Sequence, residues 1–405
     1  MSGATAEAQA ARVVITVQAL RAFLYGFSAV ILGTSLPAQG LSDAAVGAVF
    51  TAMLAGMALA SFAVGRWGDR VGRRRLYRLL LGAMGVAGAV FAVTSWLPAL
   101  LIAALSGTLS TDANESGPIT TLEQSMLADE PAELRARAYG RYNAAAYTAG
   151  SVGSLAAGGP AAFRHVVHSL PADQHWLLLY PVVAAAAVAV AARLRRIGTD
   201  RVVDRFALRG ALGPSRRTVR RLALLFAVDA TAGGFVVQSF LVFWFHRRFG
   251  ASTEVMGAVL FGTGLLSAGS SLVAGWLAPR LGLLDTMVWT HIPSNVLLLL
   301  VPLMPNLGAA VALLLLRFAL SQMDVPARQA MLAALVQPQE RTAAAGYTNT
   351  ARYVGRPAGP ALAGVLMQKV WIAAPFVVAG AVKLVYDVVV FVAFRSIPEV
   401  RRARA

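Results

Sequence analysis

The chain alternates between apolar segments about as long as a membrane is thick and short polar stretches, and this alternation restricts its fold more than any other feature. A helix that crosses the hydrocarbon core of a bilayer needs about 20 consecutive apolar residues. Twelve such segments can be placed, at 13–36, 43–64, 77–96, 99–127, 138–160, 175–194, 221–245, 254–277, 284–304, 308–334, 342–368 and 372–394. The sequence therefore predicts an all-α integral membrane protein with twelve transmembrane helices.

The composition excludes several classes of protein. Of 405 residues, 57% are hydrophobic and 14% are charged, whereas soluble domains carry about 25% charged residues. The chain has no cysteine, which excludes disulfides and thiolate metal sites. His165, His168 and His175 lie in one predicted loop with Asp173 as the nearby carboxylate, a set better suited to solvent than to a metal. No phosphate-binding loop, dinucleotide glycine pattern or nucleophile elbow is present, so we expect no enzyme, cofactor or metal.

The basic residues orient the predicted helices. If both termini are cytoplasmic, 26 of the 36 Lys and Arg residues lie in inside segments and four in outside loops, as the positive-inside rule requires. All but Lys369 and Lys383 are arginine, a bias typical of GC-rich bacterial genomes. We expect a multi-pass protein of the bacterial plasma (inner) membrane with both termini cytoplasmic. The net charge of +17 then comes from arginines that mark the cytoplasmic side. The expected surroundings are the lipid bilayer, and no nucleic-acid partner is expected.

A polar stretch at the midpoint divides the chain. It predicts an N-terminal six-helix bundle (1–194), a cytoplasmic linker (195–220) and a C-terminal six-helix bundle (221–405). The two halves share a weak repeat at an offset of 206 to 208 residues, which matches Pro118, Pro131, Glu133 and Asn143 to Pro326, Pro338, Glu340 and Asn349. Such duplication is typical of transporters built from two pseudo-symmetric bundles.

The segment 65–76 has the pattern G-x-x-x-D-R-x-G-R-R and resembles the loop between helices 2 and 3 of the major facilitator superfamily. Its glycines let the backbone turn and let helices approach closely, and its aspartate can pair with arginine. We expect a tight loop that latches two helix ends in one conformation, formed by Gly65, Asp69, Arg70, Gly72, Arg73 and Arg74. The alternative is a basic loop that only sets topology. Trp67 departs from the family's smaller aliphatic residue, and the second-half copy at 275–282 has lost the aspartate.

The resemblance implies a secondary transporter that moves a small molecule by alternating access, with its cavity between the two bundles. Helix 11 carries Gly355, Gly359, Pro360 and Gly364, which resembles the g-x-x-x-G-P-x-x-G-G pattern of proton-coupled drug and metabolite antiporters. That pattern belongs to helix 5 in those proteins, and helix 5 here holds a scrambled form. Its physical content is close helix packing together with a proline kink.

Charged residues inside membrane spans are costly and are functional candidates by default. In the superfamily, helices 1, 4, 7 and 10 line the cavity, and all four are charged here. A carboxylate in a partly dry cavity can carry a proton, and an arginine can bind an anionic group. The expected proton-coupling residues are Asp112, Glu115, Asp229 and Asp324. The expected substrate-binding residues are Arg21, Tyr25, Asn114, Gln238, Arg317, Gln322 and Arg352.

The structural alternative is that these charges form buried ion pairs that hold helices in register. Lys383 and Asp387, four apart on helix 12, are expected to satisfy each other, and His291 is expected to be a hydrogen-bonded core residue. Helix 4 lacks the superfamily's arginine, since Ala103 stands in its place, and Arg317 occupies the matching position in the second half.

These features together predict a monomeric, proton-coupled antiporter that exports a small organic solute. A proton symporter that takes up an organic anion is the first alternative, because five arginines lie in predicted spans. A non-transporting membrane sensor is a remote alternative, because no segment is long enough to form a sizeable soluble domain. The sequence leaves the substrate, the coupling ion and the direction of coupling open.

Overall fold

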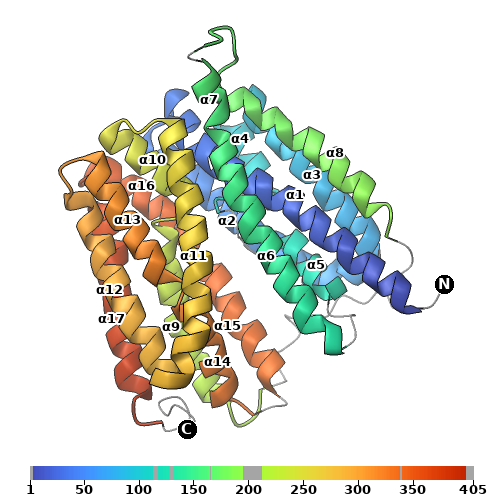
Figure 1. Cartoon of the computed structure of the whole chain (residues 1–405), viewed down its shortest axis with the longest axis vertical. Coiled ribbons are helices and arrows are strands. Elements are labelled where there is room, and N and C mark those ends of the chain that lie inside the picture. Colours follow the sequence, from blue (N-terminus) through green and yellow to red (C-terminus); the bar gives the residue numbers. More distant parts are fainter. Residues whose placement is uncertain are drawn as a thin grey trace. The chain divides into compact units, whose positions relative to one another are not determined.

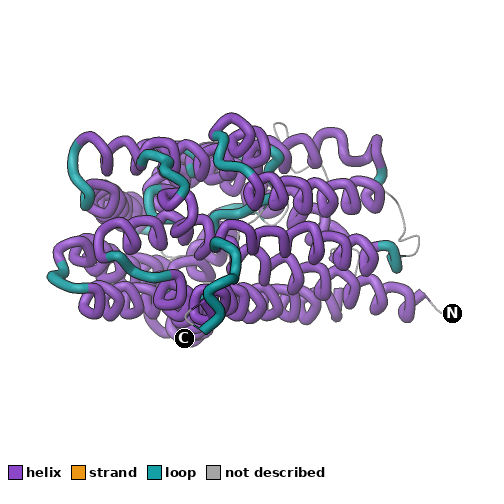
Figure 2. Tube along the Cα trace, turned by 90° about the horizontal axis from the view of Figure 1, so that it is seen from above, coloured by secondary structure: helices purple, strands orange, loops and turns teal. Residues whose placement is uncertain are grey.

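A computed structural model of the chain describes residues 3–112, 117–127, 132–164, 166–194, 212–337 and 340–397. This described part consists of helices and loops and contains no strand (Figure 2). The chain divides into two compact units, unit 1 with residues 1–204 and 237–261 and unit 2 with residues 205–236 and 262–405. Residues 237–261 thus group with the N-terminal unit, and the predicted bundle and linker boundaries stay a prediction.

Unit 1 is built on the long helix α1, which packs along α6, while α3 packs along α8 (Figure 1). Its helices are α1 (Gly3–Ala38), α2 (Asp43–Val71), α3 (Arg73–Val93), α4 (Leu97–Leu105), α5 (Pro118–Leu127), α6 (Ala132–Ala157), α7 (Gly159–Arg164), the 3-10 helix η1 (Asp173–Leu178), α8 (Leu179–Ala191) and α10 (Gln238–Phe249). The start of α11 (Thr253–Leu281) also belongs to this unit.

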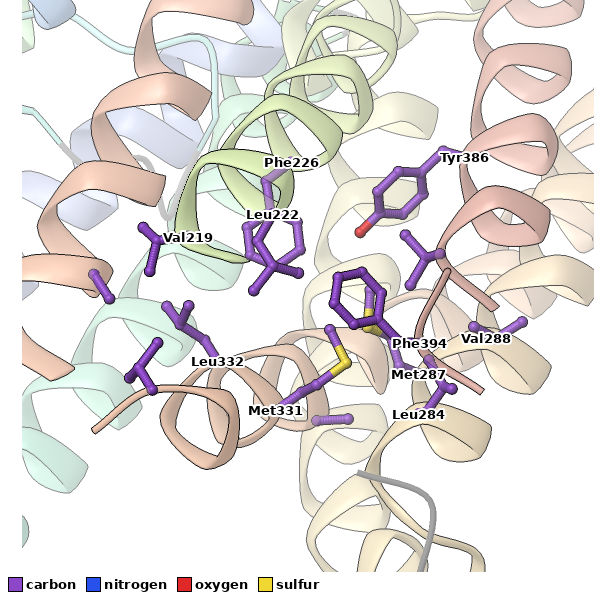
Figure 3. Packing of buried hydrophobic residues seen from close by; sticks show 14 residues of the cluster. Val219, Leu222, Phe226, Leu284, Met287, Val288, Met331, Leu332, Tyr386 and Phe394 are labelled. Atoms are coloured by element: carbon purple, nitrogen blue, oxygen red, sulfur yellow. The ribbon is translucent and has the colours of Figure 1, made fainter. Parts of the chain in front are cut away.

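Unit 2 contains the rest of α11 and a core in which side chains from five helices meet. Its other helices are α9 (Arg216–Gly234), α12 (Leu283–Leu300), the 3-10 helix η3 (Val301–Leu303), α13 (Leu307–Ser321), α14 (Asp324–Leu335), α15 (Arg341–Gly355), α16 (Ala358–Lys369) and α17 (Ala374–Phe394). Phe226 of α9, Met287 of α12, Met331 of α14 and Phe394 of α17 are all buried in this core (Figure 3).

Nine helical segments of the described part are long and apolar enough to cross a membrane. They cover every predicted span except 99–127, 138–160 and 342–368. These three spans coincide with α4 and α5, with α6 and α7, and with α15 and α16. The predicted all-α membrane fold is therefore confirmed, and the helix count of twelve is consistent with the structure.

Several predicted spans are interrupted and not continuous. The non-helical stretches lie at 106–112, 235–237, 322–323 and 356–357. Gly107 has φ +70°, a left-handed conformation that ends α4. Pro357 has no backbone N–H and stands two residues after the end of α15. A broken helix leaves polar backbone groups unpaired, and membrane proteins tolerate this only where protein or a water-filled cavity surrounds the break.

The turns at helix ends repeat between the two halves. Gly40 and Gly72 have φ +81°, and Gly250 and Gly282, each 210 positions later, have φ +65° and +95°. The predicted loop at 65–76 is shorter than expected, because α2 continues through Val71 and α3 begins at Arg73. The prediction that Gly65 turns the backbone is wrong, since the helix runs through it and Gly72 alone supplies the left-handed conformation.

Candidate functional site

Unit 1 contains a buried ion pair between Arg21 of α1 and Glu123 of α5. The two side chains are 1% and 0% exposed, and Arg21 Nη2 lies 2.5 Å from Glu123 Oε2. The phenols of Tyr77 and Tyr142 donate hydrogen bonds of 2.8 and 2.7 Å to the same carboxylate. Arg21 also donates to Thr120 Oγ1 at 3.0 Å and to Gln18. We call these six residues the Arg21–Glu123 cluster.

The Arg21–Glu123 cluster is a closed system of charges. One cation faces one carboxylate, and each carboxylate oxygen has a phenol donor in addition to the ion pair. Burying an ion pair is tolerable when the remaining hydrogen-bonding capacity of its carboxylate is satisfied in this way, although Arg21 Nε is buried without a partner. Arg21 was predicted to bind substrate, but in this structure its charge is already neutralised.

The interrupted stretch 106–112 organises a second polar contact in unit 1. The Tyr25 hydroxyl, predicted to bind substrate, donates to the Thr108 carbonyl at 2.8 Å. Asp112 Oδ1 accepts the backbone N–H of Gln238 at 2.7 Å, and the Thr111 carbonyl accepts both the N–H and the hydroxyl of Ser239 at 3.0 Å. Asp112 and Thr111 therefore accept hydrogen bonds from the first residues of α10. These residues need partners because the break at 235–237 separates α10 from α9.

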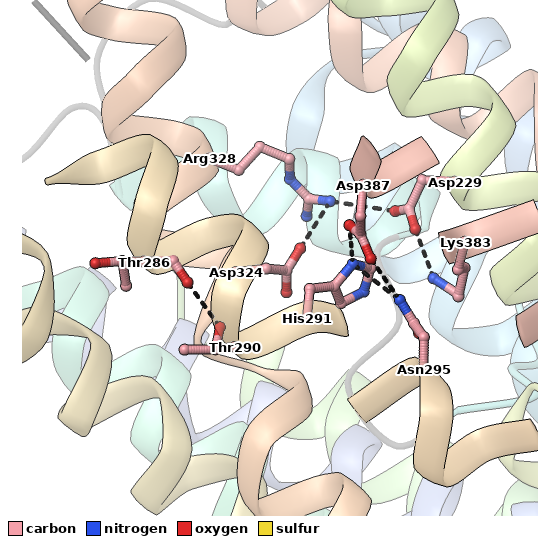
Figure 4. A network of polar contacts seen from close by, with 9 residues as sticks. All are labelled: Asp229, Thr286, Thr290, His291, Asn295, Asp324, Arg328, Lys383 and Asp387. Carbon is pink, nitrogen blue, oxygen red and sulfur yellow. Dashed lines mark hydrogen bonds and ion pairs between the residues drawn. The ribbon is translucent and has the colours of Figure 1, made fainter. Parts of the chain in front are cut away.

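Unit 2 contains a larger ion network (Figure 4). Asp229 of α9 is held by Lys383 Nζ of α17 at 2.5 Å and by Arg328 Nη1 of α14 at 3.3 Å. The same Arg328 nitrogen lies 3.3 Å from Asp324 Oδ2. All four residues are buried. This Asp229 network joins three helices through alternating charges, and it brings together two of the predicted coupling carboxylates.

A further polar group on α12 and α17 lies beside this network. His291 Nδ1 is 2.7 Å from Asp387 Oδ1, and the Asn295 amide donates to Asp387 Oδ2 at 2.9 Å. The prediction that Lys383 and Asp387 satisfy each other is wrong, because Lys383 pairs with Asp229 and Asp387 with His291. Both side chains lie on one face of α17, but their partners come from different helices. The prediction that His291 is a hydrogen-bonded core residue is confirmed, since it is buried and bonded.

The other predicted binding residues of unit 2 lie near helix breaks. Arg317 is buried on α13, and its ring contact with Phe318 is 4.9 Å from guanidinium to centroid. Gln322 lies in the break after α13, where its N–H donates to Ser270 Oγ at 3.3 Å. Arg352 is half-buried in the last turn of α15. Asn114 and Glu115 lie outside the described residues.

The predicted latch is described only in part. Gly72 is the N-cap of α3 and turns the backbone, Arg73 is buried and Arg74 is half-buried. Gly65, Asp69 and Arg70 lie in α2, and their side chains fall outside the described part.

The predicted packing glycines at the end of α15 and the start of α16 lie against α9. A methyl group on Gly355 would come within 2.7 Å of the Ala227 carbonyl oxygen, and one on Gly359 would overlap Gly234. Pro360 and Gly364 are buried in α16. The same close contact occurs in unit 1, where a methyl group on Gly26 of α1 would overlap the backbone of Gly150 in α6.

The repeat relates the two ion groups. Arg21 and Thr120 stand 208 residues before Asp229 and Arg328, and each pair is 99 residues apart in sequence. In unit 1, Arg21 of α1 donates to Thr120 at 3.0 Å. In unit 2, the equivalent Asp229 of α9 accepts from Arg328 at 3.3 Å. The two halves thus keep the positions of a polar contact and reverse its polarity.

Sequence reasoning missed Glu123, Arg328 and the roles of Lys383 and Asp387. Glu123 is an acidic residue inside a predicted apolar span, which was the available signal, but Asp112, Asn114 and Glu115 drew attention to the other part of that span. The repeat makes Arg328 the equivalent of Thr120, 208 positions later, and this was the available signal for Arg328. No group of described acidic, histidine or cysteine side chains could hold a metal ion.

Residues 18–323 match the model of the Major Facilitator Superfamily. This span covers most of the chain and includes α5, α9 and, of the Asp229 network, Asp229 itself. The chain belongs to the major facilitator superfamily. It is therefore a membrane transporter of a small molecule and not an enzyme.

Among curated proteins, this transporter is similar to an uncharacterized membrane protein of Saccharomyces cerevisiae, with 24% identity over 93% of this chain and 92% of that one. It is also similar to the uncharacterized MFS-type transporter YceJ of Bacillus subtilis, with 26% identity over 34% of this chain and 35% of that one.

Among solved structures, the transporter is similar to a bacterial homolog of the human lysosomal transporter Spinster (17% identity, all of both chains, TM-score 0.74). It also resembles the nucleoside transporter NupG (13% identity, 95% and 99% covered, TM-score 0.75) and a human organic anion transporter (19% identity, 95% and 99% covered, TM-score 0.63). At these identities the likeness shows the shared fold.

Proposed function

We propose that this transporter is proton-coupled and exports a small organic solute by antiport, with Asp229 and Asp324 as the coupling carboxylates. The observation that carries the proposal is the sharing of Asp229 between Lys383 at 2.5 Å and Arg328 at 3.3 Å. A proton on Asp229 removes its charge and weakens both ion pairs at once. Proton uptake would therefore loosen α9 from α17 and α14, and this gives the two alternative packings that alternating access requires.

Asp324 belongs to the same ion network. It shares Arg328 with Asp229, at 3.3 Å from the same nitrogen. Neutralising either aspartate leaves Arg328 to the other, so a proton on one carboxylate changes the ion pairing of both. Asp112 and Glu115 remain proposed coupling residues of unit 1. Asp112 accepts the Gln238 N–H, so a proton there would weaken the start of α10.

The direct test is flux in proteoliposomes with an imposed pH gradient, using the compound that gives the largest thermal stabilisation in a screen of the purified protein. Asp229→Asn, Asp324→Asn and Glu115→Gln are expected to lose gradient-driven accumulation and to keep exchange without a gradient. The control is Asp43→Asn, a carboxylate whose partner Arg247 is 58% exposed. Full gradient-driven flux in all three variants would overturn the coupling assignment.

The second candidate is proton symport that takes up an organic anion. A specific observation favours it, because Arg317 is buried in unit 2 and makes no ion pair with a carboxylate that the structure describes. Reversing the pH gradient separates the two candidates. Accumulation on the acidic side supports antiport, and accumulation on the alkaline side supports symport.

The segment around Gly72 is proposed to act as the conformational latch of the first half. The left-handed Gly72 and the buried Arg73 support a fixed turn at this helix junction. Asp69→Asn is expected to favour the inward-open state. The chain has no cysteine, so spin labels can be attached at Arg78→Cys and Arg220→Cys. A label distance that Asp69→Asn leaves unchanged would contradict the latch.

We further propose that the transporter is a monomer in a bacterial plasma membrane with both termini cytoplasmic. The arginine bias of the loops supports this orientation. A fluorescent protein fused to the C-terminus should fluoresce in cells, whereas a periplasmic phosphatase fusion at the same place should be inactive.

A further inference from the structure

The membrane spans of unit 2 carry more positive than negative side chains. Apart from Asp285 in the first turn of α12, the carboxylates are Asp229, Asp324 and Asp387. The cations are Arg317, Arg328, Arg352, Arg356 and Lys383. Lys383 and Arg328 are used in the Asp229 network, and Asp387 is taken by His291 and Asn295. Arg317 and Arg352 are therefore left without an ion pair to a described carboxylate.

Arg317 is the clearest uncompensated cation. Its side chain is 8% exposed, and it makes no ion pair with any carboxylate that the structure describes. Its Nε is buried without a hydrogen-bond partner. The guanidinium is oriented by Phe318, at 4.9 Å from the ring centroid. Asp229 and Asp324 act on it electrostatically without contact.

Ser321 stands one helical turn after Arg317 on the same face of α13. It is 7% exposed, and its hydroxyl is also buried without a partner. Arg317 Nε and the Ser321 hydroxyl can both donate a hydrogen bond, and neither has an acceptor among the described residues. They lie at the end of α13, directly before the break at 322–323 that separates it from α14.

Arg352 of α15 is a second cation of unit 2, and the same two carboxylates, Asp229 and Asp324, act on it and on Arg317. It is half-buried, forms no ion pair within the described part of the chain, and interacts electrostatically with Asp229, Asp324 and the like-charged Arg328. A buried cation without a counter-charge is strongly unfavourable. Arginine cannot relieve this by losing its proton. The residues that the structure describes supply no counter-charge for Arg317, and an anion from outside the chain would supply one.

We propose that Arg317, Ser321 and Arg352 form a binding site for the oxyanion group of a small organic anion, a carboxylate or a phosphate monoester. The guanidinium geometry matches both groups, and the serine hydroxyl adds a donor. The proposal rests on the proposed transport function and names its substrate class. Export of an anion against proton entry is also driven by an inside-negative membrane potential, since both movements carry charge in the favourable sense.

The test measures binding in the full-length protein without any pH gradient, so that it can fail independently of proton coupling. The probes are benzoate and phenyl phosphate, with benzamide as a neutral molecule of similar shape. We expect both anions to raise the Tm and benzamide to leave it unchanged. Arg317→Gln is expected to weaken anion binding about 10- to 100-fold, the range of one charge-assisted hydrogen bond. Arg317→Lys should fall between, and the exposed Arg220→Gln should bind as the wild type does.

A readout in the unliganded protein separates a binding role from a structural one. If Arg317 awaits an anion, Arg317→Gln removes an uncompensated buried charge, and its Tm without ligand should equal or exceed that of the wild type. If Arg317 holds the fold together, that Tm should fall and benzoate should still bind. This second result, or no response of the wild type to either anion, would overturn the proposal.

A lipid headgroup is the other source of the same chemistry. Nanodiscs of phosphatidylcholine alone and of phosphatidylcholine with phosphatidylglycerol distinguish the two. Stabilisation by benzoate in both, lost in Arg317→Gln, supports a soluble anion. Stabilisation that requires phosphatidylglycerol and that benzoate cannot replace would assign the site to lipid and overturn the substrate proposal.

Discussion

The two buried ion groups of this transporter occupy equivalent positions in the repeat and differ in how their charges balance. The Arg21–Glu123 cluster has one cation, one carboxylate and two phenols that complete the carboxylate's hydrogen bonds. The Asp229 network shares Arg328 between two carboxylates, and unit 2 has two further arginines, Arg317 and Arg352, without an ion pair to a described carboxylate. A closed pair of this kind stabilises one arrangement of helices, whereas a shared and unbalanced network can exchange partners with a proton or a ligand. We therefore expect the first group to hold unit 1 together, and we propose the second group for transport.

The strongest challenge to the comparison is removal of Glu123. Glu123→Gln leaves Arg21 buried without its counter-charge, and the expected loss of stability is about 3–5 kcal/mol. The measurement is the Tm of the purified protein in detergent. Asp43→Asn, in a partly exposed pair with Arg247, should cost less than about 1 kcal/mol. Equal shifts for the two variants would show that unit 1 does not depend on its ion pair.

Removal of Lys383 should cost less, although its ion pair has the same 2.5 Å distance. Lys383→Met leaves Asp229 with Arg328, and the neighbouring arginines supply positive charge. We expect a loss of about 1.5–3 kcal/mol, the value of one hydrogen bond to a charged group. Lys369→Met, at the chain's other lysine, which is exposed, is the matched control. A loss as large as that of Glu123→Gln would contradict the difference between the units.

The packing glycines test whether the two units are built alike. Gly26 and Gly234 are 208 residues apart, and an added methyl group would overlap the backbone of α6 at the first and come within 2.3 Å of the Arg356 carbonyl oxygen, next to α16, at the second. Both Gly→Ala changes are expected to destabilise the transporter by about 1–3 kcal/mol through overpacking. Gly269→Ala, where no atom lies within 4 Å, should be neutral or stabilising. A large loss at only one of the two sites would limit the repeat to topology.

The smallest expected effect is a pH dependence at the start of α9. Hydrogen bonds from the Ser215 hydroxyl and from the N–H groups of Gly213 and Ser215 lower the pKa of Glu340 below its ordinary 4.5. Because the folded-state pKa is lower than the unfolded one, the contribution of Glu340 to stability is complete above 4.5 and is lost as the pH falls through the lower value. The Tm difference between wild type and Glu340→Gln should therefore shrink below about pH 4.5. A constant difference at all pH values would exclude this carboxylate as the cause.

Local signals in the sequence predicted local features well. Gly72 was expected to turn the backbone and does so with φ +81°, since a left-handed conformation needs only a glycine at one position. The extent of the loop was overestimated, because arginine and tryptophan at 66 and 67 are compatible with a helix whose end extends beyond the apolar segment. The breaks at 106–112, 235–237, 322–323 and 356–357 were not predicted, because hydropathy reports burial in the membrane and not hydrogen bonding along the backbone.

The partners of charged side chains were the least predictable part of the site. Lys383 and Asp387 have the spacing of a helical ion pair, yet their partners are Asp229 and His291. Spacing along one helix shows which residues share a face, but not which neighbouring helix that face meets. Glu123 was overlooked for the same reason, since its importance depends on Tyr77 and Tyr142 from two other helices.

The sequence by itself determined that this chain is a polytopic α-helical transporter of the major facilitator superfamily, because the length of apolar segments, the positions of arginine and the motif at 65–76 are properties of contiguous residues. Only the tertiary structure decided that Arg21 is neutralised in a closed cluster while Asp229 shares Arg328 with Asp324. The physical reason is that a buried charge takes its stability from groups within about 4 Å, and the packing of helices far apart in sequence determines which groups those are.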